Sequence, residues 1–300
     1  MKNKQVFIGI VLLIVIVGIF MFTRKNSTND ISMQSNHSYT LKSDSSGKAY
    51  VANTPNEYSF SIVDDKGNTV KDFSITHTKL MHVIVARKDL AYFQHVHPDF
   101  SPATGVFTLK DLTFPADGEY RIFADFAVAN SPIDAMGMPA TASPTPFEDV
   151  SVGNIANYVP QPIGSEINTK TFDGYQVTLN TNGTLQAGGE SKLTFSLSQN
   201  GKPITDLEPY LGELGHAVIL RKDTLGFIHE HPIENVNSIQ TGNVDFMIDF
   251  PQSGTYKVFT QFQRAGKVFT TDFVVSITQK NGSSESMHGI NMSGMGNSMQ

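Results

Sequence analysis

Short runs of alternating apolar and polar residues, separated by turn signals, fill most of the chain after residue 46. Residues 58–62 (YSFSI) alternate before the turn DDKGN at 64–68, and residues 193–197 (LTFSL) alternate before QNGK at 199–202. Alternation with period two is typical of half-buried β-strands. No segment past residue 25 has a helical period. The pattern predicts an all-β protein made of immunoglobulin-like β-sandwiches, with about seven strands in each.

Two stretches of the chain repeat each other. Residues 82–98 and 216–232 both read H-x12-H-x-H-P, offset by 134, and residues 114–126 match 250–262 with an offset of 136. The repeat predicts two tandem domains rather than one large domain. Each later block (FPADGEYRIFADF and FPQSGTYKVFTQF) places Tyr, Phe and Phe three residues apart. These rings cannot all share one strand face, so we expect a bulge or a change of face there.

The N-terminus predicts a transmembrane helix ahead of the two domains. Residues 5–22 form an almost unbroken apolar run after Lys2 and Lys4, and no small-x-small cleavage site follows. Eighteen residues is near the minimum for crossing a bilayer, so we expect an uncleaved signal anchor in a single-pass membrane protein. A cleaved signal peptide is the alternative. Both interpretations place the domains outside the cytoplasm.

Composition shifts set the expected boundaries. A Ser/Asn/Thr-rich stretch predicts a flexible stalk, and a tail without any pattern of core burial predicts disorder. We expect a signal anchor at 1–25, a stalk at 26–46, β-sandwich domain 1 at 47–153, a linker at 154–166, β-sandwich domain 2 at 167–279 and a disordered Met/His tail at 280–300.

Charge and cysteine content exclude several classes of function. The net charge is −6, the isoelectric point is near 5.8, and no basic stripe is present, so nucleic acid is not an expected partner. Cysteine is absent. This absence excludes disulfides, thiolate metal sites, a cysteine nucleophile and a blue-copper centre.

The repeated histidines indicate a metal site in each domain. Residues two apart on a strand face the same way, so His95 and His97 share a face, and a hairpin would bring His82 opposite them. Three imidazoles could then hold one ion at about 2.0–2.1 Å and leave a fourth position open. The same construction applies to His216, His229 and His231. The alternative is that these imidazoles are structural and cap backbone groups, because duplication copies structural residues as well.

The residues near these histidines are weaker candidates for a role in metal binding. Arg87-Lys88-Asp89 and the matching 221–223 are interpreted as solvated hairpin tips. His77 and Glu213 occur in only one copy each, so they are poor candidates for shared ligands. Asp125 and Gln261 occupy matching positions, either as partners for an imidazole N–H or as ordinary surface residues, with the surface interpretation favoured.

Methionines in the tail favour copper as the metal. A chain segment without a core has nothing to bury Met against, and thioether sulfur is a soft ligand that selects Cu(I). The candidate ligands there are Met287, His288, Met292, Met295 and Met299. Met136 and Met138 form a smaller pair in a loop of domain 1. Histidine sites suit Cu(II) or Zn(II), so copper accounts for both features, whereas zinc leaves the tail unexplained.

Residues 209–232 (PYLGELGHAVILRKDTLGFIHEHP), followed by 250–263 (FPQSGTYKVFTQFQ), resemble a family of bacterial extracytoplasmic proteins. That family shows PYLG-x-x-GH, then F-x-H-x-HP, then G-x-Y-(K/R)-x-F/W-x-QF. The resemblance covers about 176–275, and domain 1 departs from it with THTKLMH and ADF while keeping its three histidines. It implies β-sandwich modules and an association with copper or heavy-metal handling.

These observations predict a membrane-anchored, extracytoplasmic metal-binding protein, with copper first and zinc second. It would sequester metal or pass it to a partner protein, without catalysis. Two other functions stay open: a surface adhesion or interaction module with structural histidines, and a metal-dependent hydrolase or oxidase. Against an enzyme, no general base recurs in both copies, since Glu230 corresponds to Val96.

Overall fold

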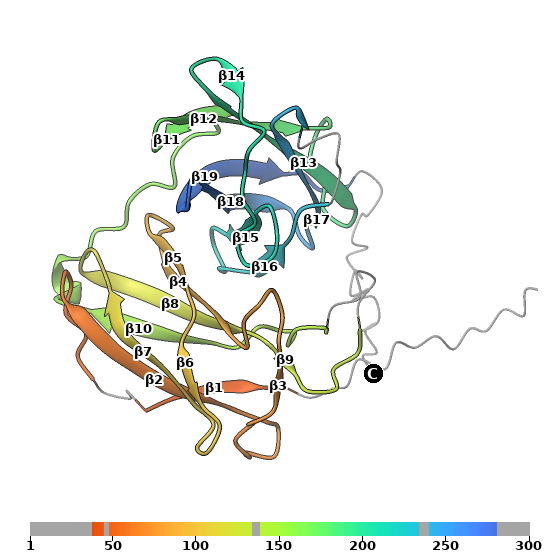
Figure 1. Ribbon diagram of the computed structural model, residues 1–300. Helices are drawn as coiled ribbons and strands as arrows, with labels where there is room; N and C mark the ends of the chain where they lie inside the picture. The colour runs from red at the N-terminus through yellow and green to blue at the C-terminus, as the bar shows by residue number, and fades with distance from the viewer. Residues whose placement is uncertain (1–37, 45–47, 134–138, 234–239, 281–300) are drawn as a thin grey trace, which may run out of the picture. The chain divides into compact units, whose positions relative to one another are not determined.

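β-Strands carry most of the regular structure (Figure 1). The computed structural model describes residues 38–44, 48–133, 139–233 and 240–280, which all belong to one compact unit beginning at His37. The predicted signal anchor therefore lies outside the described residues. Among the residues described, no helix is long and apolar enough to cross a membrane.

The first domain consists of two four-stranded antiparallel sheets. One sheet has the order β1-β2-β7-β6, and the other has the order β10-β8-β4-β5. The strands β3 and β9 form a separate two-stranded ribbon, and a 3-10 turn, η1, follows β10. The bounds are β1 Thr40–Ser43, β2 Pro55–Val63, β3 Phe73–Ser74, β4 His82–Arg87, β5 Phe93–Val96, β6 Asp99–Ser101, β7 Val106–Thr113, β8 Gly118–Asp125, β9 Ala127–Val128, β10 Phe147–Val152 and η1 Ile155–Asn157.

The second domain repeats this plan. One sheet contains β11-β12-β13-β14 with β17 paired to β13, and the other has the order β16-β15-β18-β19. The strands β18 and β19 form a long hairpin, drawn in blue in Figure 1. The bounds are β11 Thr169–Phe172, β12 Tyr175–Thr181, β13 Glu190–Gln199, β14 Lys202–Pro203, β15 His216–Arg221, β16 Phe227–Glu230, β17 Asn243–Asp249, β18 Gly254–Arg264 and β19 Lys267–Ile277.

Each domain has its own hydrophobic core between its two sheets. In the first, Phe60 and Phe107 stack with ring centroids 5.5 Å apart and pack beneath Val83 and Val85 of the facing sheet. In the second, Phe195 fills the equivalent space. Phenylalanine supplies most of these rings because the chain has no tryptophan. The prediction of an all-β protein with two tandem β-sandwich domains is confirmed.

The strands that carry the first histidine of each triad are buried on both faces. All six residues of β4 are buried, and so are five of the six in β15. Along β18, Tyr256 and Phe262 point into the domain core, whereas Phe259 points out of the opposite face into a third apolar cluster. The register of β18 with both neighbours is unbroken. The rings do not share one face, as expected, but the strand contains no bulge, because the middle ring simply serves a second packing surface.

Two other expectations need correction. The stalk expected at 26–46 contains strand β1, since Thr40–Ser43 pair with β2. Arg87, expected to be solvated at a hairpin tip, is only 7% exposed and donates to the Asp117 carbonyl over 3.1 Å. Its guanidinium also lies over the Tyr158 ring, at 4.8 Å from the centroid. The tip is thus packed against the segment that follows β10.

Candidate metal centre

The hairpin β4–β5 assembles the first histidine triad, His82, His95 and His97. Val83 pairs with Val96, which brings His82 at the start of β4 close to His97, just past the end of β5. His82 Nδ1 lies 3.0 Å from His95 Nε2 and 3.2 Å from His97 Nε2. Nitrogens that bind one tetrahedral ion at about 2.0–2.1 Å are roughly 3.3 Å apart. The triad therefore has nearly the spacing that such an ion requires.

The hairpin β15–β16 assembles the second triad, His216, His229 and His231, in the same way. Ala217 pairs with Glu230, which repeats the register of the first hairpin. One ligand nitrogen from each histidine lies within 4.8 Å of the others. The atoms His216 Nδ1, His229 Nε2 and His231 Nε2 are buried and have no hydrogen-bond partner. Three unpartnered buried nitrogens converging on one point are costly in a folded protein unless something else binds them.

Backbone carbonyls orient the first histidine of each triad. His82 Nε2 lies 3.0 Å from the Thr76 carbonyl, and His216 Nε2 lies 2.8 Å from the Tyr210 carbonyl. A carbonyl oxygen only accepts hydrogen bonds, so Nε2 carries the proton in both rings. The lone pair is therefore on Nδ1, the atom that faces the other two histidines of the triad.

The second histidine of each triad is oriented by the opposite domain. His95 Nδ1 donates to Gln261 Oε1 over 2.9 Å, and His229 Nδ1 donates to Asp125 Oδ2 over 2.6 Å. Within their own sheets Asp125 pairs with His82, and Gln261 pairs with His216. Asp125 and Gln261 are buried, 3% and 7% exposed, so interpreting them as surface residues was wrong. Each domain therefore supplies the hydrogen-bond acceptor for the second histidine of the other domain. This bond turns Nε2 of that histidine towards the histidine's own triad.

Burial keeps the triads neutral. Desolvation, followed by the mutual influence of the clustered imidazoles, lowers the pKa of His97 to about 3, and desolvation likewise lowers the pKa of His216 to about 3. The pKa values of His95 and His229 fall well below 6.5 for the same reasons. Burial also raises the pKa of the Asp125 carboxyl. At neutral pH the imidazoles are therefore uncharged, which is the state that binds a metal ion.

A seventh histidine, His77, lies beside the second triad. The His77 ring stacks on His231 with centroids 3.5 Å apart, and His77 Nδ1 lies 3.7 Å from Glu213 Oε1. His82 and His229, from different triads, have ring centroids 5.7 Å apart. The repeat makes His77 a poor candidate for a shared ligand, because its counterpart is Leu211. It reaches the second triad only because the domains dock, so repeat matching gave no signal for it.

Reciprocal aromatic contacts hold the domains together. Phe93 stacks on Phe259 with centroids 4.5 Å apart, and the repeat-equivalent pair, Phe227 and Phe123, has centroids 4.9 Å apart. These rings surround a shared apolar cluster with members from both domains, among them Ile84 and Val218. An interface in which equivalent residues exchange contacts is isologous, as in a twofold dimer. The duplicated domains thus form an internal pseudo-dimer with both triads at its interface.

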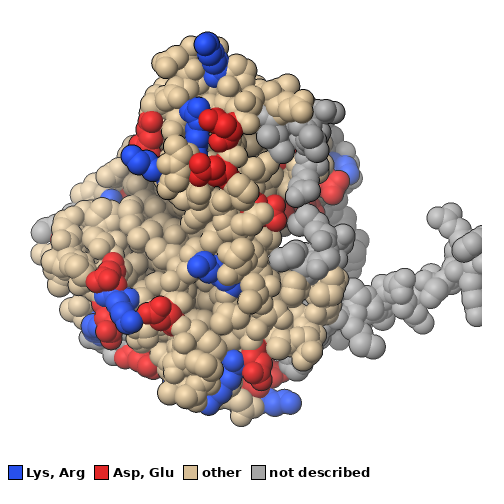
Figure 2. Space-filling view, in the orientation of Figure 1, with Lys and Arg blue, Asp and Glu red and all other residues tan. Residues whose placement is uncertain are grey.

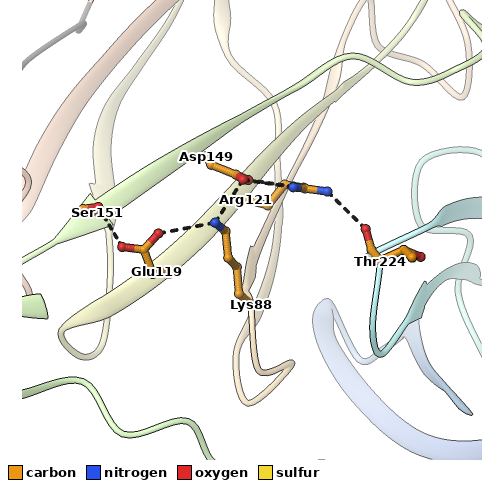
Figure 3. A network of polar contacts seen from close by, with 6 residues as sticks. All are labelled: Lys88, Glu119, Arg121, Asp149, Ser151 and Thr224. Atoms are coloured by element: carbon orange, nitrogen blue, oxygen red, sulfur yellow. Dashed lines mark hydrogen bonds and ion pairs between the residues drawn. The ribbon is translucent and has the colours of Figure 1, made fainter.

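Polar contacts across the interface also occur in repeat-equivalent pairs. Lys257 Nζ donates to the Leu90 carbonyl over 2.9 Å, and Arg121, its repeat equivalent, donates to the Thr224 carbonyl over 3.2 Å. Figure 3 shows Arg121 held by Asp149, which also pairs with Lys88. On the face drawn in Figure 2, acidic and basic side chains lie interspersed rather than gathered by sign.

The Met/His tail carries the remaining predicted ligands. Met287, His288, Met292, Met295 and Met299 lie outside the described residues, as do Met136 and Met138. The six repeated histidines are thus the predicted ligands that the structure brings together.

Comparisons with known proteins show the family of this chain. A family model described as "Domain of unknown function (DUF8832)" matches twice, at residues 34–137 and 170–279. No curated protein matches. Among solved structures, the PmoD soluble domain from Methylocystis sp. ATCC 49242 (Rockwell) is 14% identical, with a TM-score of 0.25, over 35% of this chain and 95% of that one.

Invasin, a bacterial integrin-binding protein, is 16% identical, with a TM-score of 0.25, over 81% of this chain and 39% of its own. InvD from Yersinia pseudotuberculosis is 13% identical, with a TM-score of 0.25, over 81% of this chain and 58% of its own. Likenesses this weak bear on neither site nor function. The repeated family match covers most of the chain, which therefore belongs to the DUF8832 family as a tandem pair of its domains.

Proposed function

We propose that this protein binds two transition-metal ions, one at each histidine triad. The observation that carries the proposal is the direction of the nitrogens. In both triads the first histidine donates from Nε2 to a backbone carbonyl, and the second histidine donates from Nδ1 to a side-chain oxygen of the other domain. The lone pairs on Nδ1 of the first ring and on Nε2 of the second ring therefore point into the triad. In the first triad these two nitrogens lie 3.0 Å apart, and lone pairs this close repel unless a cation lies between them. Burial disfavours a proton there, so a metal ion held by three imidazoles is the better match.

Copper is the metal we propose, with zinc as the second candidate. Neutral imidazole suits both ions, and a given nitrogen site binds Cu(II) more tightly than Zn(II). The tail supports copper further, because its methionines are soft ligands suited to Cu(I). In this account the triads hold copper and the tail collects it or passes it to a partner protein.

We further propose that the protein works outside the cytoplasm, anchored by residues 1–25, in metal homeostasis or resistance. The support is the apolar run at 5–22 with its flanking lysines. We propose binding without catalysis, because the position between the second and third histidines is Glu230 in one triad and Val96 in the other. Two equivalent catalytic centres would need the same general base in both.

Metal titration of the purified full chain in detergent tests the proposal. The chain is stripped with a chelator and then offered Cu(II), Cu(I) or Zn(II) in competition with chromophoric chelators. One variant carries His95→Ala, His97→Ala, His229→Ala and His231→Ala. The matched control carries His37→Ala, a histidine outside both triads.

We expect two tightly bound ions in the wild-type chain and in the control, and loss of both in the four-site variant. Tail variants would then report any additional Cu(I). If the four-site variant binds as much metal as the wild-type chain and is merely less stable, the histidines are structural, and the interaction-module alternative takes the place of this proposal.

A further inference from the structure

The two triads differ in the residue that holds their second histidine. In the repeat alignment Asp125 corresponds to Gln261, so one triad receives a carboxylate and the other receives a neutral amide. Asp125 lies on domain 1 but bonds His229, and Gln261 lies on domain 2 but bonds His95. Because the contacts cross the interface, the acidic partner belongs to the triad of domain 2.

We infer that Asp125 makes the domain 2 triad the tighter site for divalent ions, so that the two sites fill in order. The inference rests on the proposed function and specifies how its two sites differ. A carboxylate that accepts from the outer N–H of a ligand histidine raises the basicity of the inner nitrogen. It also places a negative charge near the bound cation. An amide oxygen orients the ring equally well but supplies no charge.

Burial strengthens the effect of the Asp125 charge on the domain 2 triad. The side chains of His229 and Asp125 are only 5% and 4% exposed, so little water screens the charge. The Asp125–His229 bond, at 2.6 Å, is also shorter than the 2.9 Å bond between Gln261 and His95. A short bond to an ionised acceptor is the stronger kind.

A second carboxylate adds to the same asymmetry. Glu213, paired with His77, lies beside the domain 2 triad. Asp125 also faces His82 across its own sheet, which gives the domain 1 triad a share of its charge. The hydrogen bond, however, goes to His229, and that bond distinguishes the two sites.

The test isolates each site in the full chain. His95→Ala with His97→Ala leaves the domain 2 triad, and His229→Ala with His231→Ala leaves the domain 1 triad. Zn(II) affinity of each is measured against a chromophoric chelator. We expect the domain 2 triad to bind Zn(II) about 10–100-fold more tightly, the size of effect seen when such outer partners are removed.

Reciprocal substitutions then separate a charge effect from structural damage. Asp125→Asn should reduce the affinity of the isolated domain 2 triad by about 10–100-fold, while Gln261→Glu should raise that of the isolated domain 1 triad. A gain of affinity in the second variant cannot arise from damage. Together the two substitutions should reverse the order of filling.

Equal affinities of the two isolated triads, or a Gln261→Glu variant with unchanged affinity, would overturn the inference and leave the proposed function intact. No binding of Cu(II), Cu(I) or Zn(II) by either isolated triad or by the wild-type chain would overturn both.

Discussion

Mild acid should destabilise the metal-free protein through His97 and His216. Burial lowers the pKa of each from 6.5 to about 3. Between these values an unfolded chain binds a proton at each imidazole, whereas the folded chain does not. The free energy of unfolding is therefore greatest above pH 6.5 and falls as the pH drops towards 3.

The size of the effect follows from the shift. One pKa unit corresponds to about 1.4 kcal/mol, and about pH 5 lies roughly 1.5 units below the unfolded pKa. Each histidine then costs about 2 kcal/mol, and the pair costs about 4 kcal/mol. This is a large part of the 5–15 kcal/mol that stabilises a typical domain.

Urea unfolding of the chelator-stripped full chain at about pH 7.5 and about pH 5 measures this loss. A variant with His97→Gln and His216→Gln removes both titrating groups, so its loss over the same interval should be smaller by about 4 kcal/mol. The substitutions also change contacts, but that cost is present at both pH values and cancels. If the variant loses as much stability as the wild-type chain, the two imidazoles are not buried in neutral form.

Three further predictions concern the interface and the ions. Phe259→Ala removes an interface ring and Phe262→Ala removes a core ring of the same strand, so each should lower the free energy of unfolding by about 3–5 kcal/mol. Only Phe259→Ala should weaken metal binding at both triads, and equal metal affinities of the two variants in titration would contradict this. His77→Ala removes the ring stacked on His231 and should weaken Zn(II) binding at the isolated domain 2 triad, while the Zn(II) affinity of the isolated domain 1 triad stays the same. Titration calorimetry of each isolated triad measures both affinities. Saturating metal at about 1,000 times Kd should raise the free energy of unfolding by about 4 kcal/mol per site, and a variant with His229→Ala and His231→Ala should show only one such increment in urea unfolding.

The repeat made the hairpins and their triads predictable. Residues two apart on a strand share a face, and the turn near Arg87 sets the register, so His82 had to lie near His95 and His97. Alternating runs predicted the sandwich sheets equally well. These are short-range consequences of strand geometry, which a single sequence contains.

Docking of the domains was not predictable by the same means. His77, Asp125 and Gln261 act on the opposite domain, and no spacing within one repeat reports such a contact. A signal was nevertheless present. The segment at 83–86 is apolar at every position and Phe259 is out of phase with the core rings, which together indicate strands buried on both faces.

X-ray absorption spectroscopy of the metal-loaded full chain tests the central claim most directly. We expect two ions per chain, each with about three imidazole nitrogens at roughly 2.0–2.1 Å and the outer-shell scattering typical of histidine rings. Loss of one ion should accompany loss of either triad. Ions bound through oxygen or sulfur alone, or a nitrogen shell unchanged after removal of His95, His97, His229 and His231, would contradict it.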